Sequence, residues 1–339
     1  MSTTMRAAVV HDARGPWTLE ERPLPEAGPG QVLVRVHACA VCGTDLWMAH
    51  GDLSYRPFPL VLGHEGVGEV VAVGAGVHSR AVGDRVGVPM VQRGCGTCAF
   101  CRQEHPASFV TAANCAAPVL TGVTVDGAFA EYVAVDAVGT VVLPEAVPYE
   151  AAAPTLCAGF TSWAALRRAA PAPGSRVGVV GIGGVGHFAV QYAKAAGHHV
   201  TAITHSPDKA ELARGLGADE VVADGAALRA AGGVDLLLHT SSHHGTVLDA
   251  TRGLRPWGKI ALMGIAFDGF AVPALDLVSQ SWQVVGSAHN GLELLVEALE
   301  MVADGRVTPV TEAFDFADVE KAHQHAAGGG ARFKAVVTL

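Results

Sequence analysis

A glycine-rich turn between an apolar strand and a helix is the feature that most restricts the fold of this chain. Residues 176–181 form an apolar run, a Gly-x-Gly-x-x-Gly pattern spans 181–186, and apolar side chains then recur at helical spacing. In a βαβ unit, such glycines permit a tight turn, close approach of a pyrophosphate, and helix–strand packing. The phosphates then face the positive end of the helix dipole. The turn therefore predicts a dinucleotide site, with contacts from Gly181, Gly183, Gly184, Val185 and Gly186.

The end of the next strand (199–204) bears on which dinucleotide binds. An NAD site usually has an acidic residue about 20 residues past the glycines, but this chain has Thr204, His205 and Ser206 there. No carboxylate repels a 2′-phosphate at that point, and Thr204, Ser206 and Lys209 are able to bind one. The sequence thus favours NADP. NAD stays possible, because Ser206 also suits a helix N-cap and Lys209 a solvated surface.

The chain divides by pattern into two domains. Strands and helices alternate over 158–288, which predicts a doubly wound parallel sheet. Residues 1–157 instead carry short valine- and glycine-rich runs between turns, typical of a β-rich domain. The tail, 289–339, has one amphipathic helix and a final apolar run, and we expect it to complete the first domain.

Composition excludes several classes of protein. Half of the 339 residues are apolar and 16% are charged, which is typical of a compact globular chain. The net charge of −9, without long runs of one sign, argues against a nucleic-acid partner. No run approaches the roughly 20 apolar residues of a membrane span. The N-terminus has no signal-peptide pattern, so we expect a cytoplasmic protein.

The cysteines indicate metal binding. There are seven, an odd number, and three stand in Cys95-x-x-Cys98-x-x-Cys101. Disulfide scaffolds are usually short, secreted and evenly paired, whereas such clusters in cytoplasmic enzymes more often bind metal. A second possible set combines a Cys-Gly-Thr-Asp motif, a Gly-His-Glu-Gly motif and a later cysteine. Two thiolates and one imidazole can hold a tetrahedral zinc with its fourth position open; the residues are Cys42, His64 and Cys157.

The order of these motifs resembles that of the zinc-containing medium-chain alcohol dehydrogenases, in particular the cinnamyl alcohol dehydrogenase-like branch. The shared elements are Cys-Gly-Thr-Asp, Gly-His-Glu, the cysteine cluster, Pro-x-Leu-Cys-Ala-Gly-x-Thr, Thr-Val-Asp-Gly and Gly-Ile-Gly-Gly-x-Gly-His, and they cover nearly the whole chain. The resemblance implies an α/β protein in which a GroES-like catalytic domain, 1–157 completed by 289–339, flanks a Rossmann domain at 158–288. It implies hydride transfer between a small-molecule alcohol or aldehyde and NADP(H), in a homodimer or homotetramer associated through the edge strand 282–287.

The resemblance also implies roles for individual residues. Two zinc ions per chain are expected: a catalytic one on Cys42, His64 and Cys157, and a structural one on Cys95, Cys98, Cys101 and Cys115. Glu65 would stand behind the catalytic metal and replace its water transiently. Asp45 would orient His64. Thr44 would hydrogen-bond the reacting oxygen and take its proton; the other interpretation of Thr44 is a turn residue after Cys42.

Two departures from the family pattern affect these expectations. Thirteen residues separate Cys101 from Cys115, an insertion of about six, which loop entropy tolerates because its cost grows only logarithmically. If Cys115 is not the fourth ligand, the alternatives are His105 or a partly disordered lobe. Five residues after Cys42, where many members carry the histidine that ends a proton relay, this chain has Trp47. His50 is the expected substitute, and a surface position is the other interpretation of it.

Two other functions stay open at this point. One is an enzyme that reduces an activated C=C or C=N bond on the same fold, which Trp47 leaves possible. The other is a non-catalytic dinucleotide-binding protein, against which the two metal-ligand sets argue.

Overall fold

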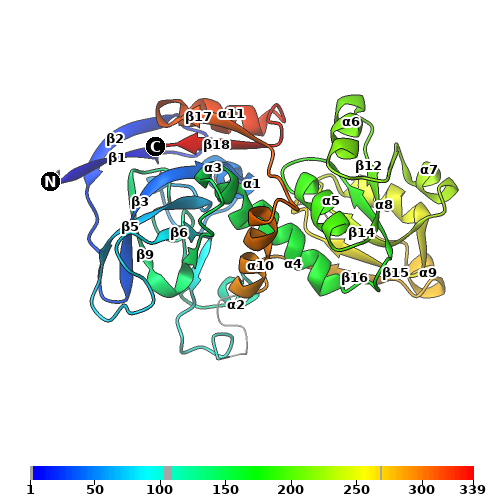
Figure 1. Ribbon diagram of the computed structural model, residues 1–339, viewed down its shortest axis with the longest axis horizontal. Helices are drawn as coiled ribbons and strands as arrows, with labels where there is room; N and C mark the ends of the chain where they lie inside the picture. Colours follow the sequence, from blue (N-terminus) through cyan, green and yellow to red (C-terminus); the bar gives the residue numbers. More distant parts are fainter. Residues whose placement is uncertain (1–2, 103–108, 268) are drawn as a thin grey trace. The chain divides into compact units, whose positions relative to one another are not determined.

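The computed structural model describes residues 3–102, 109–267 and 269–339, and the chain separates into two compact units. The first unit consists of Met1–Cys157, His289–Ala303 and Pro309–Leu339. The second consists of Ala158–Ala288 and Asp304–Thr308. In Figure 1 the blue, cyan and red segments belong to the first unit, so both ends of the chain contribute to it.

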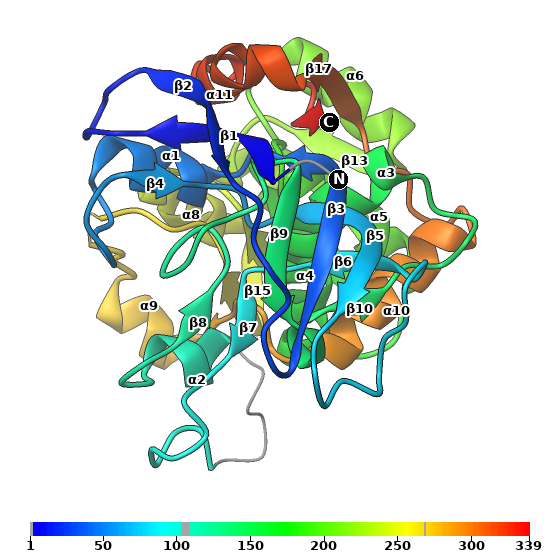
Figure 2. The same cartoon turned by 90° about the vertical axis from the view of Figure 1, so that its left-hand side faces the viewer.

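The first unit is built on β-sheets, and strands from both ends of the chain share the largest of them (Figure 2). Its order is β10-β6-β5-β3-β18-β17, and β9 also pairs with β3. β18 is antiparallel to β3 and parallel to β17, so a strand from the end of the chain lies inside this sheet. The strands are β3 (Gln31–Ala40), β5 (Gly66–Val73), β6 (Arg85–Val88), β9 (Tyr132–Asp136), β10 (Val141–Val142), β17 (Thr311–Asp315) and β18 (Lys334–Thr338).

Smaller sheets and short helices complete this unit. A three-stranded sheet has the order β2-β1-β4, and β7 pairs with β8. These strands are β1 (Thr4–Val10), β2 (Trp17–Pro23), β4 (Leu60–Val61), β7 (Val91–Arg93) and β8 (Val119–Leu120). The helices are α1 (Gly43–His50), α2 (Phe109–Ala113), α3 (Tyr149–Pro154), α10 (Leu292–Ala303) and α11 (Val319–Ala327), with 3₁₀ turns at Ala137–Gly139 and Phe316–Asp318.

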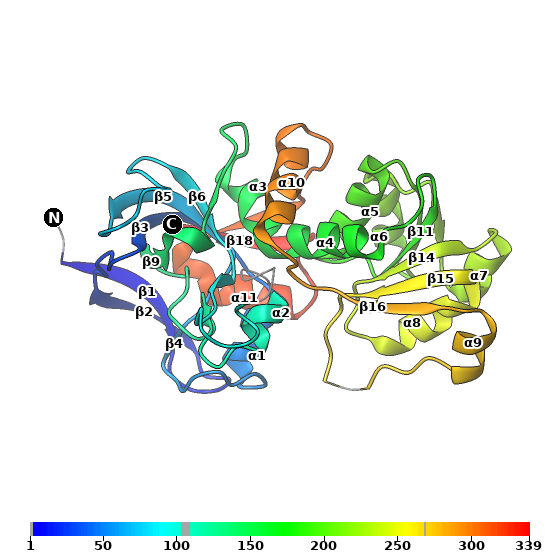
Figure 3. The same ribbon diagram turned by 90° about the horizontal axis from the view of Figure 1, so that it is seen from below.

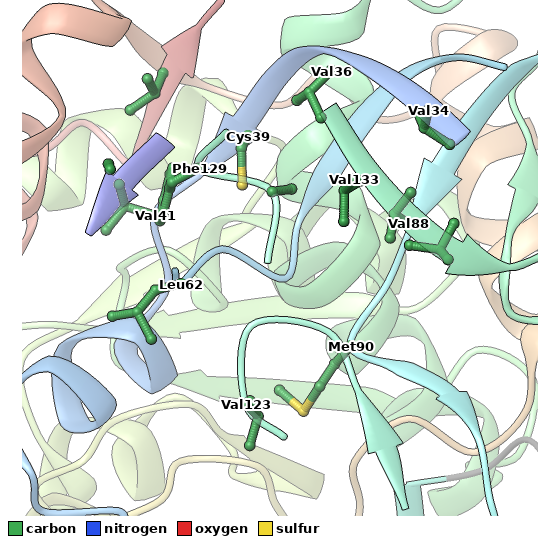
Figure 4. Packing of buried hydrophobic residues seen from close by; sticks show 14 of the residues in the cluster. Val34, Val36, Cys39, Val41, Leu62, Val88, Met90, Val123, Phe129 and Val133 are labelled. Atoms are coloured by element: carbon green, nitrogen blue, oxygen red, sulfur yellow. The ribbon is translucent and has the colours of Figure 1, made fainter. Parts of the chain in front are cut away.

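Valine dominates the core of the first unit (Figure 4). Successive side chains of a strand point to opposite faces, so Val32, Val34 and Val36 of β3 all enter this core. Cys39 lies at the end of the same strand, is fully buried in the cluster and is labelled in Figure 4. Burial raises the pKa of its thiol well above the usual value, so Cys39 is a small inert core residue.

The second unit is a six-stranded, wholly parallel sheet in the order β13-β12-β11-β14-β15-β16 (Figure 3). Helices α4 and α5 contact one face, and α7 and α8 the other, which confirms the predicted doubly wound fold. The strands are β11 (Arg176–Val180), β12 (His199–Ile203), β13 (Glu220–Val222), β14 (Val234–His239), β15 (Leu254–Leu262) and β16 (Gln283–Gly286). The helices are α4 (Phe160–Ala169), α5 (Gly186–Ala195), α6 (Pro207–Gly215), α7 (Gly225–Ala230), α8 (His244–Ala250) and α9 (Ala274–Ser279), with a 3₁₀ turn at Thr251–Gly253.

Among the described residues, the helices are all too short or too polar to cross a bilayer.

Candidate metal and dinucleotide sites

Three segments of the first unit bring a group of potential metal ligands together. Cys42 is the N-cap of α1, His64 and Glu65 connect β4 to β5, and Cys157 lies in a π-helical turn, Thr155–Gly159. One ligand atom from each of these four residues lies within 4.8 Å of the others. π-Helical turns are rare and occur frequently at functional sites.

The donor set fits a zinc ion. Sγ of Cys42 and Sγ of Cys157 are 3.7 Å apart, far beyond a disulfide bond of about 2.05 Å. That separation suits two thiolates, each about 2.3 Å from one tetrahedral metal. The hydrogen bond with Cys157 lowers the pKa of Cys42 well below its usual value, which favours the thiolate that a metal requires. Nε2 of His64 is buried and has no hydrogen-bond partner among the described residues, so its lone pair is available to a metal.

Asp45 holds two of these potential ligands, Cys42 and His64, in place. Its Oδ1 accepts hydrogen bonds from Nδ1 of His64 (3.0 Å) and from the backbone N–H of Gly63 (3.1 Å). Its Oδ2 accepts one from the backbone N–H of Cys42 (2.9 Å). A proton on Nδ1 leaves Nε2 as the coordinating nitrogen, the arrangement that a carboxylate commonly imposes on metal-binding histidines.

The turn that carries His64 depends on glycine. Gly63 has φ +96°, and a Cβ there would lie 2.8 Å from the backbone nitrogen of Phe129. Both the left-handed conformation and the close approach therefore exclude larger residues. Glycine at this position aims the following histidine at Cys42 and Cys157.

Glu65 has a partner that sequence patterns did not reveal. Nζ of Lys334, in β18, lies 2.8 Å from Oε1 of Glu65 and 2.7 Å from the carbonyl oxygen of Val41. The Lys334 side chain is 5% exposed and that of Glu65 is fully buried. The only sequence signal for this partner was a single lysine beside an apolar run in β18. Such a lysine is also common on an exposed edge strand, so the pattern did not indicate a buried ion pair. A second missed neighbour is His289, a buried imidazole that donates a hydrogen bond to the carbonyl of Cys157.

Thr44 and His50 lie at opposite ends of α1. Thr44 is half-buried in the first turn, two residues from Cys42. His50 is the last residue of the helix, and its side chain is 36% exposed. Nδ1 of His50 is 3.8 Å from Oδ2 of Asp52, and its ring lies edge-on to that of His323, with centroids 6.1 Å apart.

The second cysteine cluster also gathers in the first unit. Cys95, Cys98, Cys101 and Cys115 place their sulfurs within 4.8 Å of one another. Cys101 is central: its Sγ is 3.8 Å from that of Cys95, 3.4 Å from that of Cys98 and 3.5 Å from that of Cys115. These separations again suit tetrahedral zinc. His105, the alternative fourth ligand, lies outside the described residues.

Backbone N–H groups favour thiolates in this cluster. The N–H of Cys95 donates to Sγ of Cys115 (3.1 Å), and that of Cys98 to Sγ of Cys95 (3.4 Å). Hydrogen bonds from Thr97, its hydroxyl first, lower the pKa of Cys95 to about 5. A cysteine ionised at neutral pH is the form that binds zinc.

The glycine-rich turn of the second unit has the geometry that a pyrophosphate requires. Gly181 has φ +87°, and a Cβ on Gly186 would lie 1.9 Å from the carbonyl oxygen of Gly181. A Cβ on Gly183, by contrast, would meet nothing within 4 Å, so space is open beside the backbone there. Gly184 and Val185 complete the turn, and the Val185 carbonyl accepts a hydrogen bond from Oγ of Ser162 (2.9 Å).

A cavity of about 490 Å³ adjoins this turn at the carboxyl ends of β11 and β12. Thr204, Ser206 and Lys209 all line it. Ser206 is the N-cap of α6, but its Oγ donates to Oδ1 of Asp208 (2.6 Å) instead of capping the helix. Two carboxylates that the local sequence pattern did not indicate, Asp224 and Asp249, also line the cavity. Each accepts a backbone N–H of α7, from Ala227 (2.8 Å) and Gly225 (2.7 Å) respectively.

Comparisons with known proteins identify the family of the chain. Residues 28–145 match the alcohol dehydrogenase GroES-like domain, and residues 184–304 match the zinc-binding dehydrogenase domain. An alcohol dehydrogenase of Geobacillus stearothermophilus is 39% identical over 315 residues, 91% of this chain and 92% of that protein. One from Rhizobium meliloti is 42% identical over 311 residues, 90% of each. A cinnamyl alcohol dehydrogenase structure from Sorghum bicolor has a TM-score of 0.89 and 30% identity, and the match covers 99% of this chain and 97% of that one.

The chain therefore belongs to the zinc-dependent medium-chain alcohol dehydrogenases. It is an oxidoreductase of small-molecule alcohols or aldehydes that uses zinc and a nicotinamide dinucleotide. The predicted family, fold class and general activity are thereby confirmed.

Proposed function

We propose that the chain is an NADP-preferring alcohol dehydrogenase and aldehyde reductase, with catalytic zinc on Cys42, His64 and Cys157 and structural zinc on the four-cysteine cluster. The observation that carries the proposal is the buried, unpartnered Nε2 of His64 beside two sulfurs 3.7 Å apart. Zinc at this site supplies Lewis acidity, which lowers the pKa of a substrate hydroxyl or polarises a carbonyl. Because two thiolates balance the ion's charge, the site favours a neutral substrate.

Residues of the chain would orient the metal ligands, transfer the proton and bind the cofactor. Asp45 fixes the tautomer of His64 and the position of Cys42. Thr44 would hold the reacting oxygen through its hydroxyl, accepting the alcohol proton at Oγ while its own hydroxyl proton leaves to water. His50, at the exposed end of the same helix, would take up a proton from that water and release it to solvent, in place of the histidine that Trp47 replaces. The glycine turn would hold the pyrophosphate of the dinucleotide, which would supply the acceptor or donor of the hydride.

The relay predicts a measurable effect of His50→Gln. We expect the rate of alcohol oxidation at neutral pH to fall about 10-fold, less than the loss of a directly acting general base would cause. The pH dependence of the rate should also change, because one group that carries the proton is removed. His325→Gln is the matched control: this histidine also contacts a carboxylate, Glu312 (2.7 Å), and its side chain is 40% exposed. An unchanged pH–rate profile in His50→Gln would exclude His50 from the relay.

NADP preference rests on Thr204, Ser206 and Lys209 around the 490 Å³ cavity, and on the engagement of Asp224 and Asp249 with α7. We expect NADPH to exceed NADH in kcat/KM in steady-state reduction of a panel of aromatic and aliphatic aldehydes. Lys209→Ala should lower kcat/KM for NADPH about 10- to 100-fold, the equivalent of one charged hydrogen bond, and leave NADH within about threefold. Lys194→Ala is the control, because Lys194 pairs with Asp219 (2.6 Å) and does not line the cavity. Equal losses with both cofactors would contradict a role for Lys209 at the 2′-phosphate.

We further propose that the protein is a homo-oligomer associated through the second unit. β16 is the edge strand of its sheet, and Val284 on it is 43% exposed. Nearby in sequence, Leu275 and Val278 of α9 are 78% and 76% exposed. Unpaired strand edges and apolar surface of this kind are typical of self-association.

A further inference from the structure

Lys334 occupies an unusual position for a lysine. It lies in β18, between β3 and β17, and its side chain is 5% exposed. Lysine is almost never fully buried without a partner, because removal of an ammonium from water is costly. Here the ammonium has two partners, the Glu65 carboxylate at 2.8 Å and the Val41 carbonyl at 2.7 Å.

Those partners belong to the two segments that carry metal ligands. Val41 directly precedes Cys42, and Glu65 directly follows His64. The backbone N–H of Val41 also donates to the carbonyl of Ala335, the residue after Lys334 (2.9 Å). One residue of β18 therefore ties both segments to the same strand.

The two oxygens of Glu65 differ in their surroundings. Oε1 accepts the Lys334 hydrogen bond, whereas Oε2 is buried with no hydrogen-bond partner among the described residues. A carboxylate oxygen of Glu65 also lies within 4.8 Å of the ligand atoms of Cys42, His64 and Cys157. Carboxylate oxygen is itself a good zinc ligand, so this residue is able to compete with substrate for the open position.

The formal charges of the groups at this site indicate what restrains Glu65. Two thiolates already balance a divalent metal, so the carboxylate adds one uncompensated negative charge. Lys334 supplies the matching positive charge inside the same buried site. Without it, Glu65 has two ways to neutralise itself: it takes up a proton, or it coordinates the metal.

We propose that Lys334 is a positioning residue that keeps Glu65 off the catalytic metal and thereby keeps the fourth position open to substrate. This inference rests on the proposed zinc site of Cys42, His64 and Cys157. The C-terminal strand would thus control access of substrate to the metal. It would do so by holding Glu65 and without contacting the substrate.

Cobalt(II) in the catalytic site provides a readout independent of turnover, because its visible absorption reports the ligands and geometry of the ion. Zinc is retained in the four-cysteine site, and imidazole, which binds an open metal position, is titrated against the holoenzyme. In Lys334→Met we expect an altered cobalt spectrum and about 10- to 100-fold weaker imidazole binding, the range typical when the partner of a metal-site residue is removed. Lys334→Arg, which keeps the charge and the donors, should stay close to wild type.

The double variant Lys334→Met/Glu65→Gln separates this role from general damage to the fold. It should recover wild-type imidazole affinity, because the competing carboxylate is gone. Lys259→Met is the control: Nζ of Lys259 also donates to a backbone carbonyl, that of Ala169 (2.6 Å), but in the second unit. Unchanged spectrum and affinity in Lys334→Met, or failure of the double variant to recover, would overturn the inference. If Cys157→Ala binds cobalt with the wild-type spectrum, the proposed metal site itself is wrong.

Discussion

Cys157→Ala is expected to abolish alcohol oxidation while the protein stays folded. The variant removes one of the three proposed ligands, at a site where Cys42 and Cys157 place their sulfurs 3.7 Å apart. Loss of the metal forfeits several kcal/mol of charge stabilisation, so kcat/KM should fall by at least about 1,000-fold at 1.4 kcal/mol per tenfold. Metal analysis of the purified variant should show about one zinc per chain instead of about two.

Cys39→Ala is the matched control for that experiment. Cys39 is also buried in the first unit, but it packs in the valine-rich core and belongs to neither ligand group. We expect its zinc content and activity to stay near wild type, with a stability change of about 1 kcal/mol. Substantial activity in Cys157→Ala would show that Cys157 is not a ligand needed for catalysis.

Cys101→Ser is expected to have its main effect on stability, not on chemistry. Cys101 is the central sulfur of the second cluster, within 3.8 Å of the other three. Zinc that binds only the folded state contributes to folding free energy, so its loss should lower the melting temperature by at least about 4 °C. Zinc should again fall to about one per chain, but activity should stay within about threefold of wild type before thermal inactivation.

The same measurement identifies the fourth ligand of that cluster. Cys115→Ser should lose this zinc as completely as Cys101→Ser does, whereas His105→Ala should retain it. The reverse result would replace Cys115 by His105. Full zinc content in Cys101→Ser would contradict a four-cysteine structural site altogether.

Sequence patterns predicted most strands of the second unit and its helices α5 and α6, because these elements carry a local signal. The strand, glycine turn and helix at 176–196 follow from apolar runs and glycines that the structure places where the pattern requires them. The start of β15 was harder to predict from the sequence. We expected a strand at 259–264, but β15 runs from Leu254 to Leu262, and a register shift and a positive φ of 59° at Trp257 interrupt its pattern.

The first unit depends more on contacts between distant residues, which patterns do not record. Helix α1 follows Cys42 directly and is too short for clear periodicity; Asp45 stabilises its start through a hydrogen bond from the N-cap. The π-helical turn around Cys157, the helix α11 and the strand β17 were also not predicted. Local residues indicated which side chains form the two ligand groups. The partners Lys334 and His289, which come from the far end of the chain, could be recognised only in three dimensions.

The position of β18 also has a consequence for synthesis of the protein on the ribosome. Glu65 and Lys334 are 269 residues apart in the chain. At about 5–20 residues per second, Glu65 emerges roughly 10–50 s before its counter-ion is made. The nascent chain therefore carries Cys42, His64 and Glu65 through most of its translation without the strand whose lysine neutralises the glutamate. The mature charge balance of the proposed metal site is therefore set late, after nearly all of the remaining fold has been produced.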